Sequence, residues 1–339
     1  MSGSSERMME AARPAAHGAA RGGGRGVPGA PPRMGGIALR NGLVLLTERH
    51  WAAAVREADG SISVSSGRKP RLSPSGRVTG AGAGSKGGSA GSPAGVPLLR
   101  GLGRFGESLL VLAVVKIRLP GAELPLEGGR VAAALAGSLV ATAAVKSLVP
   151  KSALLQEAGS AAAAFVPAVL ALKNSPISGY HGAEHKVIGS REAGFAAESS
   201  GGGSGGGAGA AGARSAARAA ERFAAAQKEH DRCGSNLVGP YLLATMATNL
   251  IARGRSGHKS PAASAIAGAV SLGVALEALR WATRNGDSML ARLLLMPGRA
   301  LQKHLTTAEP SADQLEVGER AMAELLRLEA SASPMATAW

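Results

Sequence analysis

Residues 180–188 read Tyr180-His-Gly-Ala-Glu-His-Lys-Val-Ile188. In a helix, His181, Glu184 and His185 occupy positions i, i+3 and i+4, so their side chains leave one face within about one turn. The spacing H-x-x-E-H reverses the zincin motif H-E-x-x-H, in which two histidines bind zinc and the glutamate polarises the attacking water. The pattern predicts a divalent metal site, of the zinc type, with His181 and His185 as ligands and Glu184 as general base. The alternative is a helix whose polar face is simply solvated.

A second cluster, further along the chain, offers the remaining ligand. It reads Glu229-His-Asp-Arg-Cys-Gly234 and holds the single cysteine of the sequence. His230 and Cys233 are spaced i, i+3, and a mononuclear zinc site needs a third or fourth ligand from elsewhere in the chain. By itself the cluster is weak, because a lone cysteine is usually a small buried hydrophobe and a lone histidine a hydrogen-bonded surface residue. Beside the first motif, it predicts that His230 or Cys233 completes the metal site.

Three polar residues next to these motifs are candidates for supporting roles. Tyr180 and Arg232 could stabilise a developing oxyanion, as hydrogen-bond donors do in acyl transfer. Glu192 follows His185 by seven residues and falls close to the same helix face. It lies about 10 Å further along the axis at about 1.5 Å per residue, too far to bind the same ion as the histidines. Glu192 is therefore a substrate contact, a partner of a ligand, or a solvated surface residue.

The motifs together resemble a known family. The resemblance starts with Tyr180–Lys186, Glu192-Ala-Gly194 and His230-x-Arg-Cys-Gly234, and extends over most of the chain outside its low-complexity runs. Its other parts are Gly35–Ala38, Trp51–Arg56, Asp59-Gly60, Pro97–Gly101, Glu107-Ser108, Pro297-Gly298 and Leu305–Pro310. The sequence is similar to the YqhQ family, whose members are bacterial and plastid membrane proteins of unknown function, described as predicted metal-dependent enzymes. The resemblance implies a membrane protein with a metal site, but no particular reaction.

Composition favours a membrane protein over a soluble one. The 339 residues include only 4 Phe, 2 Tyr and 3 Trp, and the apolar part is mainly Ala, Gly, Leu and Val. Small residues bury little area in a soluble core, whereas membrane helices use them to approach one another closely. The net charge of +15, from 38 Lys+Arg and 23 Asp+Glu, fits basic loops beside anionic lipid headgroups. No aromatic-basic motif typical of a nucleic-acid partner accompanies this charge.

The chain divides by composition and pattern into five segments. They are a disordered tail or transit peptide at 1–34, an antiparallel β unit at 35–66, a disordered linker at 67–96, a helical membrane domain at 97–310 with a disordered insert at 199–213, and a C-terminal helix at 311–332. The tail is rich in Ala, Gly, Arg and Ser and has no continuous apolar run, which argues against a secretory signal and fits a plastid or mitochondrial transit peptide or a plain disordered basic tail. The family resemblance, which includes plastid members, favours the plastid. In the β unit, Asp59-Gly60 is a hairpin signal.

Apolar runs in the helical part predict about four membrane spans. They cover 131–149, 153–172, 234–252 and 261–276, close to the roughly 20 residues that a bilayer requires. Because the first two are rich in alanine, buried helices of a soluble bundle are the alternative. Residues 98–119 form an amphipathic pattern expected to lie at a membrane interface or on a helix bundle. The predicted fold class is thus α+β, with a small β unit followed by a mainly helical integral-membrane bundle.

The function predicted from these features is a metal-dependent membrane enzyme of the hydrolase type. Peptide, lipid and phosphoester substrates are all compatible with this set of residues. Two alternatives stay open: a scaffold or assembly factor with a structural metal, and a membrane protein that binds lipid headgroups without a metal. The expected partners are membrane lipids rather than nucleic acid, and the expected location is a plastid membrane if the N-terminus is a transit peptide, otherwise the cytoplasmic membrane.

Overall fold

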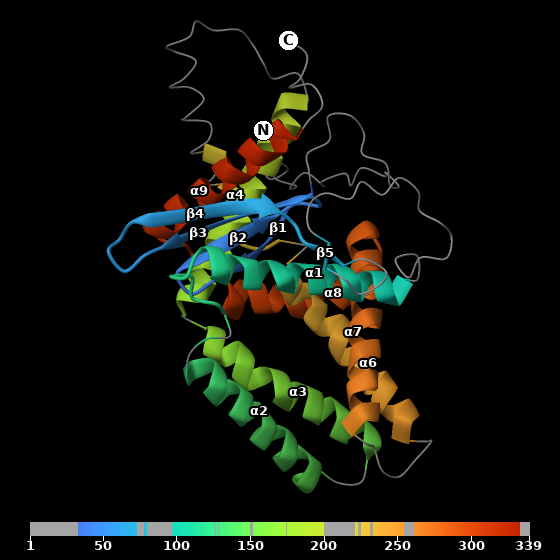
Figure 1. Cartoon of the computed structure of the whole chain (residues 1–339). Coiled ribbons are helices and arrows are strands. Elements are labelled where there is room, and N and C mark those ends of the chain that lie inside the picture. The colour runs from blue at the N-terminus through green and yellow to red at the C-terminus, as the bar shows by residue number, and fades with distance from the viewer. Residues whose placement is uncertain are drawn as a thin grey trace, which may run out of the picture.

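The computed structural model describes residues 33–72, 78–79, 97–125, 127, 129–149, 152–173, 175–199, 221–222, 225–230, 233–253 and 261–332. It is an α+β protein with a small sheet at the N-terminal end followed by helices (Figure 1). The predicted fold class is confirmed at this level. The predicted tail at 1–34 lies outside the described residues except for its last two, of which Met34 is buried in the core. Apart from Ser199, the predicted insert at 199–213 also lies outside the described residues.

The sheet is a four-stranded antiparallel meander. Its strands are β1 (Gly35–Ala38), β2 (Gly42–Leu46), β3 (His50–Arg56) and β4 (Ile62–Arg68), in that spatial order. The hairpin predicted at Asp59-Gly60 joins β3 to β4. Gly60 adopts φ +85°, a conformation that glycine tolerates without a steric cost, and the backbone N–H of Ser61 donates to Oδ1 of Asp59 at 2.9 Å.

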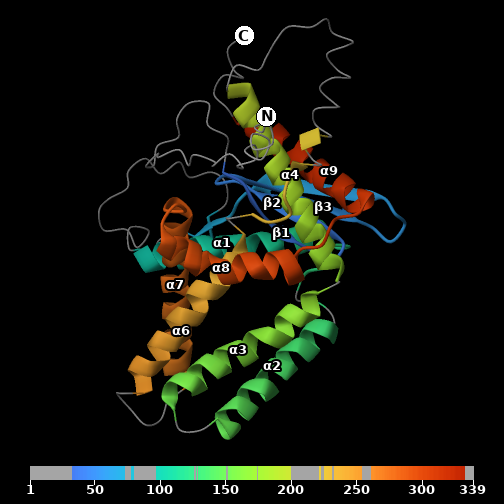
Figure 2. The same ribbon diagram turned by 180° about the vertical axis from the view of Figure 1, so that it is seen from behind.

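Helices cover both faces of this sheet, which explains why β2 is buried at every position. On one face Leu43 and Leu45 pack against α4 (Pro176–Ser199) and α9 (Ala312–Ser331). On the other, Val44 and Leu46 pack against α1 (Pro97–Arg118). Because successive side chains of a strand point to opposite faces, this arrangement needs a continuous apolar run rather than an alternating one. Figures 1 and 2 show the sheet between α4 and α9 on one side and α1 on the other.

Two boundaries differ from the sequence prediction. Strand β4 continues to Arg68, and β5 (Arg71–Leu72) pairs with β6 (Val78–Thr79) inside the segment predicted as linker. The backbone N–H of Leu72 donates to the Glu107 carboxylate at 3.1 Å, so a side chain of α1 holds β5. Helix α1 packs on helix α7, in one of its expected positions, and its Val111 and Val115 also pack on the sheet.

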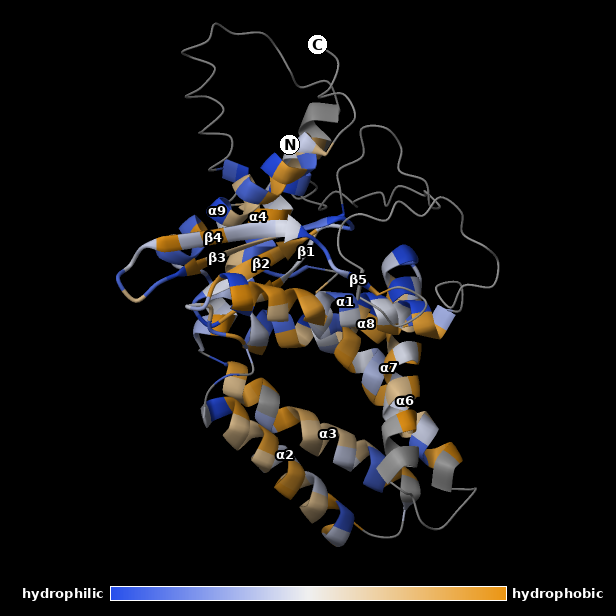
Figure 3. Cartoon of the chain, in the orientation of Figure 1, coloured by the Kyte–Doolittle hydropathy of each residue, from blue (hydrophilic) through white to orange (hydrophobic). Residues whose placement is uncertain are grey.

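Three helices of the described chain are long and apolar enough to cross a membrane. They are α2 (Gly129–Leu148), Leu154–Leu172 of α3 (Ala153–Leu172) and Ile266–Arg284 of α7 (Pro261–Arg284). Helices α2 and α3 form a hairpin away from the sheet, with apolar residues along its outside (Figure 3). Leu139 and Leu148 of α2 are 75% and 81% exposed. So much exposed leucine is unusual for a soluble surface and is consistent with a membrane protein.

The predicted span at 234–252 is divided in the structure. It consists of a 3-10 turn, η2 (Gly234–Leu237, 4 residues), and α6 (Val238–Arg253, 16 residues). Helix α6 alone is too short to be among the three candidates. It packs against α7, and the amphipathic helix α8 (Met289–Leu301) then leads into a π-helical turn, η3 (Gln302–Thr306). The last helix, α9, begins with the predicted capping box of Ser311 and Gln314.

Candidate metal centre

Helix α4 carries the H-x-x-E-H motif with its two histidines on one face. The imidazole rings of His181 and His185 meet edge to face, with centroids 4.5 Å apart. A neighbouring face of the same helix supplies Ala183 and Val187 to the core against the sheet and α9. Because this apolar face is packed, the rotation of α4 is fixed. The histidines are thereby held in one direction, toward the start of η2.

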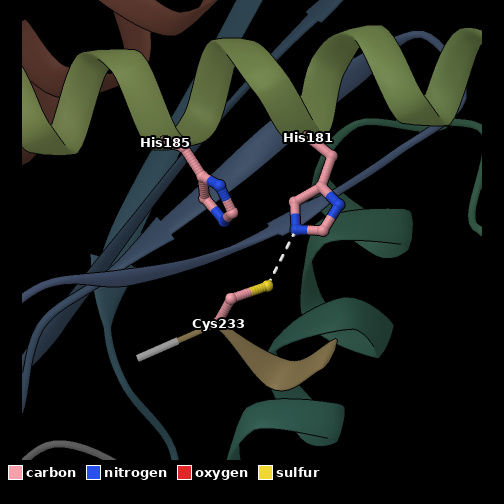
Figure 4. Close-up of side chains that lie close together, drawn as sticks. All are labelled: His181, His185 and Cys233. Atoms are coloured by element: carbon pink, nitrogen blue, oxygen red, sulfur yellow. Dashed lines mark hydrogen bonds between the residues drawn. The ribbon is translucent and has the colours of Figure 1, made fainter. Parts of the chain in front are cut away.

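Cys233 lies opposite these histidines, at the N-cap of η2. Its Sγ atom is 3.0 Å from Nε2 of His181, and one ligand atom each from His181, His185 and Cys233 falls within 4.8 Å of the others. Figure 4 shows both imidazoles projecting from α4 toward the thiol. His185 and Cys233 are buried, and His181 is partly so. The structure thus brings together three of the four predicted ligands, from segments 52 positions apart in the chain.

Backbone carbonyl groups orient both imidazoles. Nδ1 of His181 is 2.9 Å from the carbonyl oxygen of Thr306, and Nδ1 of His185 is 2.5 Å from that of Lys228. A carbonyl oxygen only accepts, so each Nδ1 must carry the proton and donate it. The remaining nitrogen, Nε2, then presents a lone pair. This is how metal-binding histidines are usually fixed, with one nitrogen on the metal and the other on a carbonyl or carboxylate.

Nε2 of His185 is buried and, within the described ranges, has no hydrogen-bond partner. A buried polar atom without a partner costs about 1 to 3 kcal/mol, so native proteins rarely leave one. The other nitrogen of the same imidazole, Nδ1, already donates a hydrogen bond to the carbonyl oxygen of Lys228. The lone pair of Nε2 is therefore available to a ligand located among the three side chains.

Glu184 lies beside the histidines and is almost completely buried. A Cβ atom added to Gly36 of β1 would be 2.6 Å from its Cδ atom, so the carboxyl group fits against glycine backbone. Burial raises the pKa of Glu184, and the charges of His181 and His230 oppose this shift. The carboxyl group is thus next to the imidazoles but in a poorly solvated position. It lies between α4 and the edge strand β1.

His230 does not join the three-residue cluster. Its backbone N–H donates to Oε1 of Gln302 at 2.8 Å, and its Nε2 is 3.5 Å from Oε2 of Glu192. The ring centroid is 5.8 Å from that of His185. These contacts direct the imidazole of His230 toward Glu192, whereas Cys233 lies with His181 and His185. Glu192, one of the candidates for supporting a ligand, is a partner of His230.

Tyr180, one of the two predicted oxyanion donors, lies in the core rather than at the cluster of His181, His185 and Cys233. Tyr180 is 6% exposed and belongs to the core between α4, the sheet and α9. Burial raises the pKa of Tyr180, and a hydrogen bond with Arg56 on β3 opposes this effect. The preceding position on a helix points about 100° away from His181, which explains why the tyrosine faces the sheet. Arg232 lies outside the described residues.

Several residues at the centre were not predicted from the sequence. Gln302 and Asn236 are fully buried, and Gln302 Nε2 donates to Oδ1 of Asn236 at 3.1 Å. Asn236 Nδ2 donates in turn to the carbonyl of His230 at 3.2 Å. Buried amides at the start of η3 and in η2 thus fix the chain that carries His230 and Cys233. A Cβ atom on Gly182 would lie 2.0 Å from the carbonyl oxygen of Ala308, so α4 packs directly on the backbone after η3.

Comparison with known proteins gives one match. A family model described as "Protein of unknown function (DUF1385)" matches residues 216–328, which is 113 of the 339 residues. No curated protein and no solved structure matches the chain. The matched segment contains Cys233 and the helices α6 to α9, whereas the H-x-x-E-H helix lies before it. Over this third of its length the chain is similar to an uncharacterised domain family, which is consistent with its resemblance to the YqhQ family.

Proposed function

We propose that the chain is a metal-dependent membrane enzyme of the hydrolase type, with a zinc ion held by His181, His185 and Cys233. The observation that carries this proposal is the buried Nε2 atom of His185. Among the described residues this atom has no hydrogen-bond partner, and His185 forms a cluster with His181 and Cys233. The alternative of a solvated polar face does not fit, because His185 and Cys233 are buried.

The three donors suit zinc better than a hard cation. Imidazole nitrogen and thiolate sulfur are the usual ligands of zinc, whereas calcium and magnesium take oxygen. The donor atoms lie within 4.8 Å of one another, and bonds of about 2.0 to 2.3 Å to one tetrahedral ion would place such atoms roughly 3.5 Å apart, so the 3.0 Å between Nε2 of His181 and Sγ of Cys233 would widen slightly. The carbonyls of Thr306 and Lys228 already hold both rings in the tautomer that a metal requires.

Zinc with three protein ligands and one open position would supply Lewis acidity and lower the pKa of a coordinated water toward about 7. In this proposal Glu184, which lies on the same helix as both histidines, takes up the proton. Burial raises the pKa of Glu184, so this carboxylate binds a proton more strongly than a solvated glutamate does. His230, held toward Glu192, is then a second titratable group beside the site rather than a ligand.

We also propose a fourth membrane span, formed by η2 and α6 together. The 4 residues of η2 and the 16 of α6 make a 20-residue segment whose one charged residue is Arg253 at its end, which is about the length needed to cross the hydrocarbon core. Both ligand segments then adjoin spans, because α4 follows α3 and Cys233 precedes η2. The centre would lie at the membrane surface. The membrane is a plastid membrane if residues 1–34 act as a transit peptide, and the cytoplasmic membrane otherwise.

The direct test is the metal content of the detergent-purified protein, measured by inductively coupled plasma mass spectrometry. About one equivalent of zinc is expected in the wild type, and a loss of most of it in His181→Ala and Cys233→Ala. His304→Ala is the matched control, because His304 is an exposed histidine of η3. Wild type without metal, or equal content in all variants, would reject the proposal and favour a lipid-binding protein without a metal.

A structural metal is the second candidate, and one observation favours it. The cluster links α4, which packs on the sheet, to the segment that starts α6. A closed four-ligand site there would join the two parts of a scaffold protein, whereas three ligands with an open position indicate catalysis. X-ray absorption at the zinc edge distinguishes them. Two nitrogens, one sulfur and one light water-like oxygen support the enzyme, and a fourth protein ligand supports the scaffold.

A further inference from the structure

A second polar site lies where α1 crosses α7. It is a cavity of about 270 Å³ whose lining includes four cationic side chains, Lys69, Arg100, Arg104 and Arg280, and one carboxylate, Glu277. The lining therefore has an excess of three positive charges, from four cations minus one carboxylate. Like charges gathered around a cavity repel one another, so such an arrangement favours an anion.

Glu277 does not neutralise this cluster. One nitrogen of Arg100, Nη2, is 3.1 Å from both carboxylate oxygens of Glu277, and Nη1 of Arg280 is 3.8 Å from Oε2 of the same group. Two arginines thus share one carboxylate. Within the described part of the chain, Lys69 and Arg104 form no ion pair, and Nε of Arg100 is buried without a hydrogen-bond partner. Several N–H donors therefore remain available to a bound group.

The surroundings of Lys69 also favour a bound anion. Burial lowers the pKa of Lys69, and the cations Arg104 and Arg71 lower it further, while Glu107 and Glu48 act in the opposite direction. An anion between Lys69 and Arg104 would remove both the repulsion and part of the desolvation cost. A phosphate group fits this demand, because guanidinium and ammonium groups form their strongest hydrogen bonds with phosphate or carboxylate oxygens.

The surroundings of the cavity resemble the edge of a membrane. Arg280 lies four residues before the end of the candidate span Ile266–Arg284. Next to the cavity, α1 exposes Leu99, Phe105 and Leu109, and Phe105 also lines the cavity. In Figure 1, α1 crosses α7 on the side of the sheet, away from the α2–α3 hairpin. Basic groups at the end of a span, beside exposed apolar residues, occur at headgroup depth.

We propose that Lys69, Arg100, Arg104 and Arg280 form a binding site for a phosphate group, which an anionic phospholipid headgroup or a free phosphate ion could supply. The site is separate from the metal centre, and its test does not depend on metal. The exposed apolar residues of α1 would accompany the acyl chains if the source is a lipid. Arg100 and Arg280 are held by Glu277, so Lys69 and Arg104 are the residues whose loss changes binding without breaking an ion pair.

The experiment is isothermal titration calorimetry, in which the full-length, detergent-purified protein is titrated with each of three probes. These are dioctanoyl phosphatidylglycerol, dioctanoyl phosphatidylcholine and sodium phosphate. If the source is a lipid, phosphatidylglycerol should bind more tightly than phosphatidylcholine, whose choline cation is repelled, and more tightly than phosphate. If the source is the free ion, sodium phosphate should bind as tightly as the lipid and displace it. Either pattern supports the site, and the absence of binding by all three probes overturns it.

Variants connect the binding to these side chains. Lys69→Gln and Arg104→Gln should each weaken binding at least about 5-fold, since each removes a charge-assisted hydrogen bond. Arg104→Lys keeps the charge and should bind more tightly than Arg104→Gln. The matched control is Arg320→Gln, because Arg320 is an exposed arginine of α9. Unchanged binding in both glutamine variants, or equal weakening in Arg320→Gln, would overturn the proposal, and an unchanged thermal unfolding temperature confirms that each variant is folded.

Discussion

Nε2 of His181 lies 3.0 Å from Sγ of Cys233, although the two residues are 52 positions apart and belong to segments that flank different helices. The other nitrogen of the same ring is held by the carbonyl of Thr306, from a third segment. Three distant parts of the chain therefore meet at one imidazole. This convergence explains why the centre can be tested by changes at several independent positions.

The sulfur ligand gives a spectroscopic prediction. Replacing the native metal by cobalt should produce thiolate-to-cobalt charge-transfer absorption in the near ultraviolet if Cys233 binds the ion. Cys233→Ser should lose this band. His230→Ala should retain it, because His230 is directed toward Glu192 rather than into the cluster. Loss of the band in His230→Ala but not in Cys233→Ser would show that the two residues have the opposite roles.

Glu184→Gln separates catalysis from metal binding. The carboxyl group is beside the imidazoles but is not one of the three clustered ligands, so the variant should keep its zinc. Hydrolysis of a substrate found by screening peptide, phospholipid and phosphoester panels should fall about 100-fold or more, as expected on removing a general base. Unchanged turnover with zinc retained would favour the structural role, and the exposed Glu319 of α9 provides the control Glu319→Gln.

Gly182→Ala should destabilise the protein by about 1 to 3 kcal/mol, because the added Cβ atom would overlap the carbonyl oxygen of Ala308. Thermal unfolding in detergent measures the change. Gly103→Ala is the control, since no atom lies within 4 Å of the Cβ position in the middle of α1. Alanine is the better helix former, so this second variant should be as stable as the wild type or about 0.5 to 1 kcal/mol more stable.

Acid should weaken the contact between α9 and the sheet. Hydrogen bonds from Arg327 and then from Ser66 lower the pKa of Glu324 to about 2, below the model-compound value of 4.5. A lowered folded-state pKa gives stability that is present above pH 4.5 and is lost as the pH falls toward 2. Glu324→Gln should therefore lower the unfolding temperature at pH 7 but have a smaller effect at pH 3. An equal effect at both pH values would show that ionisation of Glu324 is not the cause.

The protein should fractionate with membranes and resist extraction by alkaline carbonate. The reason is the apolar surface of α2 and α3, where leucines of both helices are more than half exposed. Integral proteins remain in the pellet under this treatment, whereas peripheral ones are released. Recovery of a soluble monomer without detergent would contradict the spans, and with them the placement of the centre at a membrane surface.

The sequence was sufficient to predict that His181 and His185 lie on one face of a helix. H-x-x-E-H has a fixed geometry on any α-helix, so His181 and His185 could be expected on one face without knowledge of the fold. The sequence could not decide between His230 and Cys233, since both lie in one short cluster and either could turn toward the histidines. The position of His230 depends on Gln302, which is 72 positions away in the chain and accepts a hydrogen bond from the backbone N–H of His230.

The local sequence pattern also could not predict which side chains of α4 lie in the core. Tyr180 directly precedes His181, and only the presence of the sheet places the tyrosine in the core. The segments around Gly36 and Leu305–Pro310 were noted for their family resemblance, yet nothing in their composition indicates contact with α4. In the structure, Gly36 packs on Glu184, and the carboxylate of Glu309 pairs with Lys186. Contacts between residues so far apart in the sequence depend on tertiary packing, which the periodicity of the sequence does not predict.

The position of α9 imposes an order on how the protein can be made. This helix covers the first strands of the chain, and its Glu329 accepts a hydrogen bond from Thr47, 282 positions earlier. Residues 35–68 leave the ribosome long before residues 312–331, and the three helices that are apolar enough to span a membrane emerge between them. One apolar face of the newly formed sheet therefore stays exposed until the C-terminal helix α9 has been synthesised. Such an exposed apolar face is what chaperones bind, so synthesis of this protein should depend on one until α9 has docked.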